Sequence, residues 1–264
     1  MTKNIPPKIY KFQSFKSEKS IENLRHGQIW FSKPEGLNDP FDCAISIIFT
    51  YPEEDMITFV REHYLEDLRK KGKSGEISQR ELQYLPNGKP SQELIDQTEK
   101  YLKETNQQRR KEFSQNGVAC FTTEMNNILM WSHYADGHKG FCLEFDTNYF
   151  KFNDKLNLNE VIYNNSFPTL SPLDIVQKPL RVIEPLITKS KDWEHEKEWR
   201  LITKEGNSAI EYNPKALTAI YFGCWITKEN MEKIATLPAK SAARLFQMQR
   251  SETEFKLEYV PYRV

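Results

Sequence analysis

Residues 8–32 read KIYKFQSFKSEKSIENLRHGQIWFS, and this stretch decides how the chain begins to fold. The segment 8–12 has the aromatic and β-branched residues of a short strand. Residues 17–26 carry apolar side chains at helical spacing, and Gly27 is a natural end for that helix. The segment 28–32 predicts a second strand. This order of strand, helix, glycine and strand predicts an α+β fold.

Strand-like segments continue through the rest of the chain and are separated by turn residues. They cover residues 44–51, 117–122, 140–146, 160–164, 197–203, 219–223, 243–249 and 255–260. Two more helices are predicted, over 126–137, with Asn126 as the N-cap, and over 227–237. We therefore expect residues 1–264 to form one α+β domain around a mixed, mostly antiparallel sheet.

Residues 52–116 differ from the rest in composition. They mix acidic and basic residues in almost equal numbers, and their apolar residues recur at helical spacing. Such a pattern is typical of helices with a solvated face. We expect 52–116 to be a charged helical insertion.

Bulk composition limits the class of protein and its compartment. The 264 residues include 37 basic and 37 acidic side chains, so the chain has no overall attraction for nucleic acid or an anionic membrane. No apolar run is long enough to span a bilayer, and the N-terminus lacks the apolar core of a signal peptide. The cysteines match no zinc-binding spacing and are interpreted as reduced thiols: Cys43, Cys120, Cys142 and Cys224. We expect a cytoplasmic protein without a membrane partner.

The stretch 193–202 reads WEHEKEWRLI and concentrates carboxylates beside aromatic rings. Alternation along a strand turns Trp199 toward the core and places Glu198 and Arg200 together on the opposite face. We expect Glu196 to be solvated, because it precedes the strand. One interpretation makes Glu198 a carboxylate held in a cleft. The other is an exposed ion pair, which contributes little to stability.

The stretch 130–146 reads MWSHYADGHKGFCLEFD. His133 and His138 point to different sides of a helix, so they do not form a metal-binding pair. Composition alone favours Trp131 and Tyr134 as core residues. The functional alternative is that Tyr134 and a histidine present polar groups to a cleft at the end of the helix.

The stretch 37–42 reads LNDPFD and has turn chemistry. Asn38 and Asp39 favour a turn, and Pro40 keeps the preceding residue extended. A structural turn explains these residues. A functional loop is the alternative, because the turn follows a short strand.

Taken together, these motifs resemble one prokaryotic family. The resemblance is carried by W-F-S-x-P-x-x-L-N-D-P-F-D, W-S-H-Y-A-D-G-H-K-G-F-C-L-E-F, W-x-x-E-x-E-W-R and a late Y-F-G, over about residues 8–223. The family is known as domain of unknown function 2971, and its name implies no established chemistry.

The opening order of elements also resembles, more distantly, ADP-ribosyltransferase folds. Laid onto that order, Glu198 is the catalytic carboxylate, with Tyr134 and His133 as further catalytic residues, although the chain lacks the Ser-Thr-Ser triplet of those folds. Lys11 stands where they have a basic or histidine residue. The resemblance is one of fold order, so its functional reading is an analogy. The residues expected to bind the substrate are Lys11, Asn38, Asp39 and Arg200.

The function implied by this resemblance is cleavage of the nicotinamide–ribose bond of NAD. A carboxylate stabilises the oxocarbenium-like transition state, and no metal is needed. We therefore expect an NAD-dependent ADP-ribosyltransferase or NAD glycohydrolase, with a role as a toxin or phage-defence effector, an unknown nucleic-acid or protein acceptor, and NAD as substrate. The alternatives are a metal-independent nuclease and a non-catalytic binding module.

Overall fold

The computed structural model describes residues 4–43, 70, 92–150, 158–168, 183–237 and 243–263. The chain divides into two compact units. Unit one contains residues 1–42, 115–164 and 189–264, and unit two contains residues 43–114 and 165–188. The sheet and the candidate site both lie in unit one.

Unit one is built on an eight-stranded sheet with the order β12-β11-β10-β4-β1-β3-β8-β5. Its strands are β1 (Lys8–Gln13), β3 (Gly117–Thr122), β4 (Phe141–Asp146), β5 (Leu158–Glu160), β8 (Glu198–Thr203), β10 (Leu217–Phe222), β11 (Arg244–Arg250) and β12 (Leu257–Pro261). All neighbouring pairs are antiparallel except β10 and β11. The helix α9 (Lys228–Ala235) lies between those two strands in sequence, as a parallel connection requires. This confirms the predicted α+β class with a mixed, mostly antiparallel sheet.

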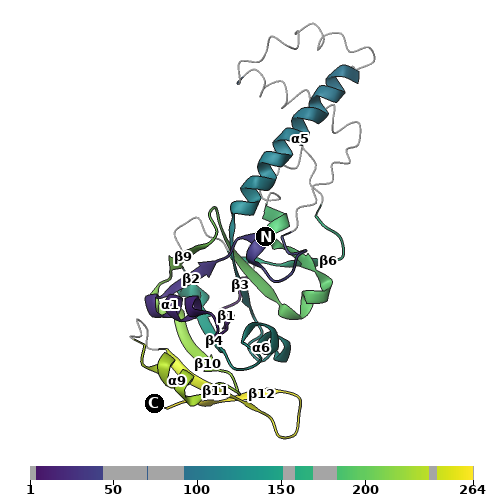
Figure 1. Cartoon of the computed structure of the whole chain (residues 1–264). Coiled ribbons are helices and arrows are strands. Elements are labelled where there is room, and N and C mark those ends of the chain that lie inside the picture. The colour runs from purple at the N-terminus through teal and green to yellow at the C-terminus, as the bar shows by residue number, and fades with distance from the viewer. Residues whose placement is uncertain are drawn as a thin grey trace. The chain divides into compact units, whose positions relative to one another are not determined.

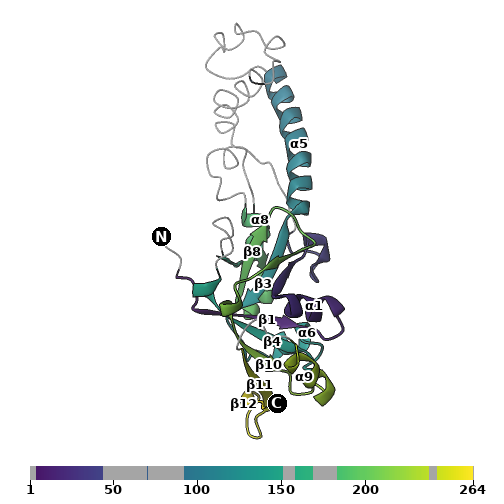
Figure 2. The same cartoon turned by 90° about the vertical axis from the view of Figure 1, so that its left-hand side faces the viewer.

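The pairing of β1 is uneven. It pairs with β4 along its whole length, from Lys8 to Gln13. On its other side it pairs with β3 at a single position, Tyr10 opposite Thr122. Beyond β3, the strands β3 and β8 run side by side over six residue pairs (Figure 2). The strands β1 and β3 are therefore paired over a much shorter length than β1 and β4.

The first helix forms as its sequence predicts. α1 (Glu18–His26) starts after Ser17, whose backbone is extended, and ends at Gly27. Gly27 has a φ of 64°, a left-handed conformation that favours glycine. β2 (Gln28–Phe31) follows and pairs with β9 (Ser208–Glu211) in a separate two-stranded sheet.

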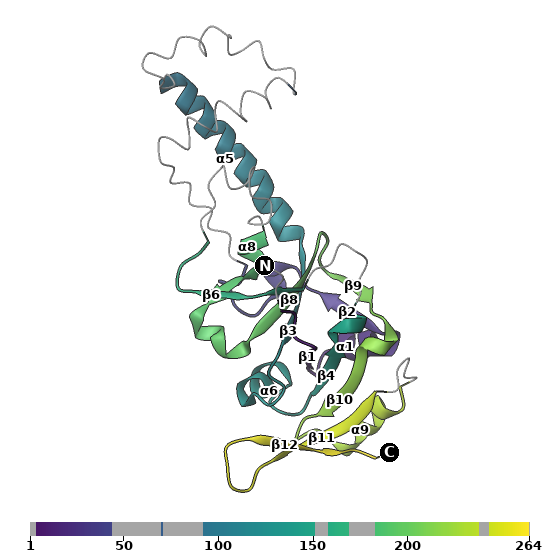
Figure 3. The ribbon, with the colours of Figure 1, turned by 180° about the vertical axis from the view of Figure 1, so that it is seen from behind.

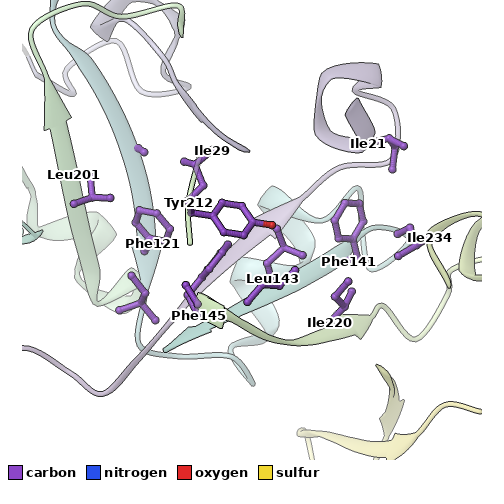
Figure 4. Close-up of a cluster of buried hydrophobic side chains, with 14 of the residues drawn as sticks. Ile21, Ile29, Phe121, Phe141, Leu143, Phe145, Leu201, Tyr212, Ile220 and Ile234 are labelled. Carbon is purple, nitrogen blue, oxygen red and sulfur yellow. The ribbon is translucent and has the colours of Figure 1, made fainter. Parts of the chain in front are cut away.

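One face of the large sheet packs against α1 and α9. The cluster includes Ile21 from α1, Ile234 from α9 and Leu143 from β4, all buried (Figure 4). Phe121 and Phe145 meet edge to face in the same cluster, with ring centroids 6.0 Å apart. This apolar layer is the main core of unit one.

The opposite face of the sheet packs against α6 (Ile128–Tyr134), which Figures 1 and 3 show on the other side from α1 and α9. Trp131 is fully buried there and meets Phe12 of β1 edge to face. α6 is shorter than the predicted helix 126–137. Its N-cap is Asn127 rather than Asn126, because the Asn127 side chain accepts hydrogen bonds from two backbone amides of the first turn.

The remaining elements of unit one are short. They are the 3₁₀ helices η1 (Pro34–Gly36), η4 (Thr147–Tyr149), η6 (Lys191–Glu196) and η7 (Pro214–Ala216), and the paired strands β6 (Ile162–Asn164) and β7 (Thr188–Ser190), whose first residue belongs to unit two. The sequence did not reveal β7, β9 or η6, because each is too short to show a periodic pattern.

Unit two contains α5 (Gln92–Gln115), whose last residue belongs to unit one, and α8 (Glu184–Ile187). α5 is helical as expected for that part of 52–116, while most of the predicted insertion and the predicted strand 44–51 lie outside the described residues. The single-domain organisation stays a prediction. Among the helices that the structure describes, none has the length and apolar character to cross a bilayer.

Candidate functional site

The strand β8 places its side chains as alternation predicts. Trp199 and Leu201 belong to the apolar core, while Glu198 and Arg200 point to the opposite face, the one that α6 covers. Both charged side chains are buried, and Arg200 is 0% exposed. The interpretation of 193–202 as an exposed ion pair is therefore wrong.

Arg200 is the centre of a buried ion cluster. Its two terminal nitrogens donate to the carboxylate oxygens of Asp42 at 2.8 and 2.7 Å, and its Nε donates to Glu198 Oε1 at 2.8 Å. The fork-to-carboxylate contact with Asp42 is bidentate, which only a planar guanidinium can form. Asp42 closes the LNDPFD turn, so this turn and the late strand β8 meet at the cluster.

Lys189 of β7 is the second cation of the cluster. Its Nζ lies 2.5 Å from Glu196 Oε2, 3.1 Å from Glu198 Oε2 and 3.6 Å from Asp42 Oδ2. Burial alone would lower the pKa of Lys189, but the charges of these carboxylates outweigh burial and raise it. Lys189 is therefore a fixed positive charge.

Glu196 lies inside the cluster, although we expected it to be solvated. It is 2% exposed, because η6 ends at this residue and Lys197 follows with a left-handed φ of 46°. Glu196 precedes the strand as expected, but these turns keep its side chain in the cluster rather than in solvent. The Glu196 backbone oxygen accepts a hydrogen bond from Thr122 Oγ1 at 2.5 Å, which ties η6 to the sheet.

The two glutamates have opposite pKa shifts. Burial acts to raise the pKa of Glu198, but the charges of Arg200 and Lys189 outweigh it and lower this pKa to about 2. Burial raises the pKa of Glu196, and the charge of Lys189 only partly opposes this. Glu198 is thus held ionised, while Glu196 protonates more readily than an ordinary glutamate.

Tyr134 and Asn38 connect the cluster to α6 and to the LNDPFD turn. The Tyr134 hydroxyl donates to Glu196 Oε1 at 2.6 Å and accepts from Asn38 Nδ2 at 3.2 Å. Burial is the main reason that the pKa of Tyr134 is raised. Tyr134 therefore stays protonated and orients the Glu196 carboxyl group.

A small pocket of about 100 Å³ adjoins this cluster. Its lining residues are Tyr10, Lys11, Phe12, Cys120, Phe121, Met130, Tyr134, Lys189, Glu196 and Glu198. One side is thus aromatic and apolar, and the other is charged. Its volume is below the roughly 300 Å³ at which drug-sized ligand pockets begin, so it accommodates one ring or a smaller group.

Lys11 lies at this pocket but is not paired with a carboxylate there. Its Nζ donates to the Cys120 backbone oxygen at 3.0 Å and lies 5.2 Å from the centroid of the Phe121 ring. Burial lowers its pKa, although the neighbouring Cys120 and Glu198 act in the opposite direction.

Two predicted site residues lie elsewhere. His133 is exposed, does not line the pocket, and meets the ring of Trp193 edge to face at 6.2 Å. Asp39 is buried, but its Oδ1 accepts a hydrogen bond from the Phe41 amide at 2.9 Å, which is a local turn contact. Of the seven predicted residues, the structure brings together Lys11, Asn38, Tyr134, Glu198 and Arg200.

Sequence reasoning missed Asp42, Lys189 and Glu196. Asp42 is the last residue of LNDPFD, which we interpreted as a turn. The sequence did not indicate that this aspartate is buried and pairs with Arg200. Lys189 had no signal in the sequence, because its neighbours 188–190 form too short a strand. For Glu196, the signal was the spacing of its carboxylate two residues before Glu198.

The cluster is arranged around ammonium and guanidinium groups. Among the described residues, no three His, Cys, Asp or Glu side chains form a group that could hold a metal ion. The ammonium group of Lys189 lies between Glu196 and Glu198, in the place that a metal ion bound by both carboxylates would occupy. The expectation that the reaction needs no metal stays a prediction.

Comparison with known proteins gives one match. No curated protein and no solved structure matches the chain. The family described as "Protein of unknown function (DUF2971)" matches residues 130–201, the segment from the start of the α6 motif to β8. The resemblance of this chain to the family DUF2971 is thereby confirmed over the segment that supplies Tyr134, Lys189, Glu196 and Glu198 to the cluster.

Proposed function

We propose that this pocket cleaves an N-glycosidic bond and that NAD is its substrate. The observation that supports the proposal is the pair Glu196 and Glu198, which line one pocket with opposite pKa shifts. Two carboxyl groups whose environments separate their pKa values are suited to different roles in one reaction. The proposal rests on this pair and not on a likeness of fold.

Glu198 is the group suited to stabilise positive charge. It stays ionised over the physiological pH range, and cleavage of the nicotinamide–ribose bond develops positive charge on the ribose. Lys189 and Arg200 fix the carboxylate in place, so little reorganisation is needed as the charge develops.

Glu196 is the group suited to proton transfer. Its raised pKa makes its carboxylate a stronger base than an ordinary glutamate, and Tyr134 orients it. In the proposed reaction Glu196 takes a proton from the attacking water or acceptor hydroxyl. The neutral nicotinamide leaves without needing a proton.

The size of the pocket limits how NAD is bound. A volume of about 100 Å³ admits only the reacting end of the dinucleotide, with the aromatic side formed by Tyr10, Phe12 and Phe121 available to the nicotinamide ring. The adenosine end stays outside this pocket. No Gly-rich dinucleotide-binding motif is needed for such a partial enclosure.

The test is release of nicotinamide from NAD, followed by chromatography. We expect Glu198→Gln to lower kcat by on the order of 100-fold or more, as for loss of an electrostatic group that acts in the transition state. Glu196→Gln should lower it by about 100-fold, the smallest contribution usual for a general base. Glu194→Gln is the matched control, because Glu194 lies on the same 3₁₀ helix and is exposed.

The same assay shows the role of Glu196 through its pH dependence. A base must be deprotonated, so the rate should fall as the pH drops below the raised pKa of Glu196, and Glu196→Gln should abolish this dependence. Absence of nicotinamide release from the wild type, or equal losses at positions 194 and 198, would remove the proposal.

Cellular effects extend the proposal to an effector role. If the chain acts as a toxin or phage-defence effector, its expression should deplete cellular NAD and slow growth, and Glu198→Gln should prevent both. The nuclease alternative keeps its own test, degradation of RNA in EDTA. That alternative would use either His133 or His138 with Glu198 and Arg200, and neither histidine lines the pocket.

A further inference from the structure

Two lysines line the same pocket in contrasting surroundings. Lys189 Nζ contacts carboxylate oxygens of Glu196 and Glu198 at 2.5 and 3.1 Å. Lys11 Nζ instead contacts a backbone carbonyl, that of Cys120, and faces the Phe121 ring. The first environment stabilises an ammonium ion strongly, and the second does so weakly.

The difference decides which amine can react. Only a neutral amine has the lone pair that attacks carbon, and desolvated lysines in partly apolar pockets are used in this way. The carboxylates keep Lys189 charged, whereas burial lowers the pKa of Lys11. The titratable groups that line the pocket around the Lys11 amine are Tyr10, Cys120, Tyr134, Lys189, Glu196 and Glu198.

The neighbouring thiol is not a competing nucleophile. Cys120 lies at the same pocket, but burial raises its pKa well above the usual range, so it remains a thiol. Thiols attack as thiolates, and a thiol of raised pKa is correspondingly inert. Lys11 is therefore the nucleophile that this pocket offers.

We propose that Lys11 is a nucleophilic amine that forms an imine with a small aldehyde or ketone ligand in this pocket. The Nζ lone pair attacks the carbonyl carbon and gives a carbinolamine. The new C–N bond becomes a double bond as the former carbonyl oxygen leaves as water, with both of its protons derived from the amine. Glu196 and Tyr134 stand at the same pocket and can carry these protons.

The pocket restricts the ligand to a small carbonyl compound. A volume of about 100 Å³ accommodates one ring or a smaller group, so the carbonyl compound must be short. Short hydroxyaldehydes belong to this class, and their hydroxyl groups match the polar side of the pocket. Cleavage of NAD is not part of this inference, so either proposal can fail without the other.

Reductive trapping tests the proposal on the wild-type protein. The protein is incubated with glycolaldehyde and cyanoborohydride at about pH 6.5, and the modified lysines are quantified by peptide mass spectrometry. Lys11 should be modified faster than Lys16, because burial lowers the pKa of Lys11 and so raises the neutral fraction of its amine. Lys16 is the matched comparison, since it lies near in sequence and its side chain is 82% exposed.

Two further results sharpen the outcome. Lys189 should remain unmodified although it lines the same pocket, and Lys11→Arg should remove the fast site while leaving the rates at exposed lysines unchanged. Modification of Lys11 no faster than of Lys16, or modification of Lys189 at the same rate as Lys11, would overturn the proposal. The comparison of Lys11 with Lys16 and Lys189 is made within the wild-type protein, so it does not depend on whether the Lys11→Arg variant folds.

Discussion

Two glutamates are buried on the same face of the large sheet, and their surroundings differ. Glu144 of β4 is 1% exposed and accepts hydrogen bonds from Lys8 Nζ at 3.0 Å, Thr218 Oγ1 at 2.7 Å and Tyr221 OH at 2.9 Å. Glu198 of β8 is held by two buried cations and shares both with other carboxylates, Lys189 with Glu196 and Arg200 with Asp42.

The difference separates a structural carboxylate from a candidate catalytic one. Hydrogen bonds from Thr218, Lys8 and Tyr221 outweigh burial and lower the pKa of Glu144, and Glu144 does not line the pocket at Glu198. At the other cluster, Glu196 is forced beside Glu198 and has a raised pKa. Carboxyl groups with strongly perturbed pKa values cluster at functional sites.

The largest effect should come from removing the central guanidinium. Arg200→Met leaves Asp42 and Glu198 buried without their main partner and should lower the free energy of unfolding by about 3–5 kcal/mol, measured with urea. Arg244→Met is the counterpart at the other cluster. Arg244 lies 3.9 Å from Glu144 and its side chain is 64% exposed, so a loss below about 1 kcal/mol is expected. Similar losses at both positions would show that the clusters do not differ.

The next effect concerns how the stability contributions of Glu196 and Glu144 change with pH, and the two should change in opposite directions. The pKa of Glu196 is raised in the folded state, so its contribution to stability decreases as the pH rises through the unfolded and then the folded pKa. The pKa of Glu144 is lowered, so its contribution is present above the unfolded pKa and lost as the pH falls through the folded one.

Urea unfolding of two variants between about pH 4 and 7 tests these signs. The stability of Glu196→Gln relative to the wild type should improve as the pH rises, and that of Glu144→Gln should worsen. If both differences change in the same direction, the contrast between the clusters is lost.

The smallest effects should come from single hydroxyl groups. Tyr134→Phe and Thr218→Val each remove one donor to a buried glutamate and should each lower the free energy of unfolding by about 1 kcal/mol. Only Tyr134→Phe should change nicotinamide release. The hydrogen bond from Tyr134 lowers the pKa of Glu196. Losing this bond should therefore move the pH profile of the rate to higher pH. An equal effect of Thr218→Val on the profile would argue against a special role for the pocket.

Regular patterns made most of the fold predictable. Alternation from Glu198 to Leu201 assigned the two faces of β8 correctly, and Gly27 marked the end of α1. Irregular backbone limited the same reasoning. Spacing from Glu198 put Glu196 on the correct side, but its burial ahead of the strand depends on the 3₁₀ helix and the left-handed Lys197.

The motif at residues 130–146 contains one residue of the candidate site, and other residues of the motif have structural roles. Tyr134 contacts Glu196, whereas the ring of His138 stacks on Trp131 with planes 13° apart. A Cβ atom on Gly140 would lie 2.1 Å from the Gln13 oxygen, so a glycine is needed where β4 starts beside β1. Sequence alone could not sort these roles, because packing and close approach depend on distant strands.

The single residue pair between β1 and β3 has a consequence for hydrogen exchange. β1 and β3 both supply pocket residues, among them Lys11 and Cys120, and between them only Tyr10 and Thr122 are in register. Amides along this seam have fewer cooperative partners than those between β1 and β4, so they should exchange with solvent sooner. The floor of the pocket is therefore the place where the sheet can part locally while the rest of unit one stays folded.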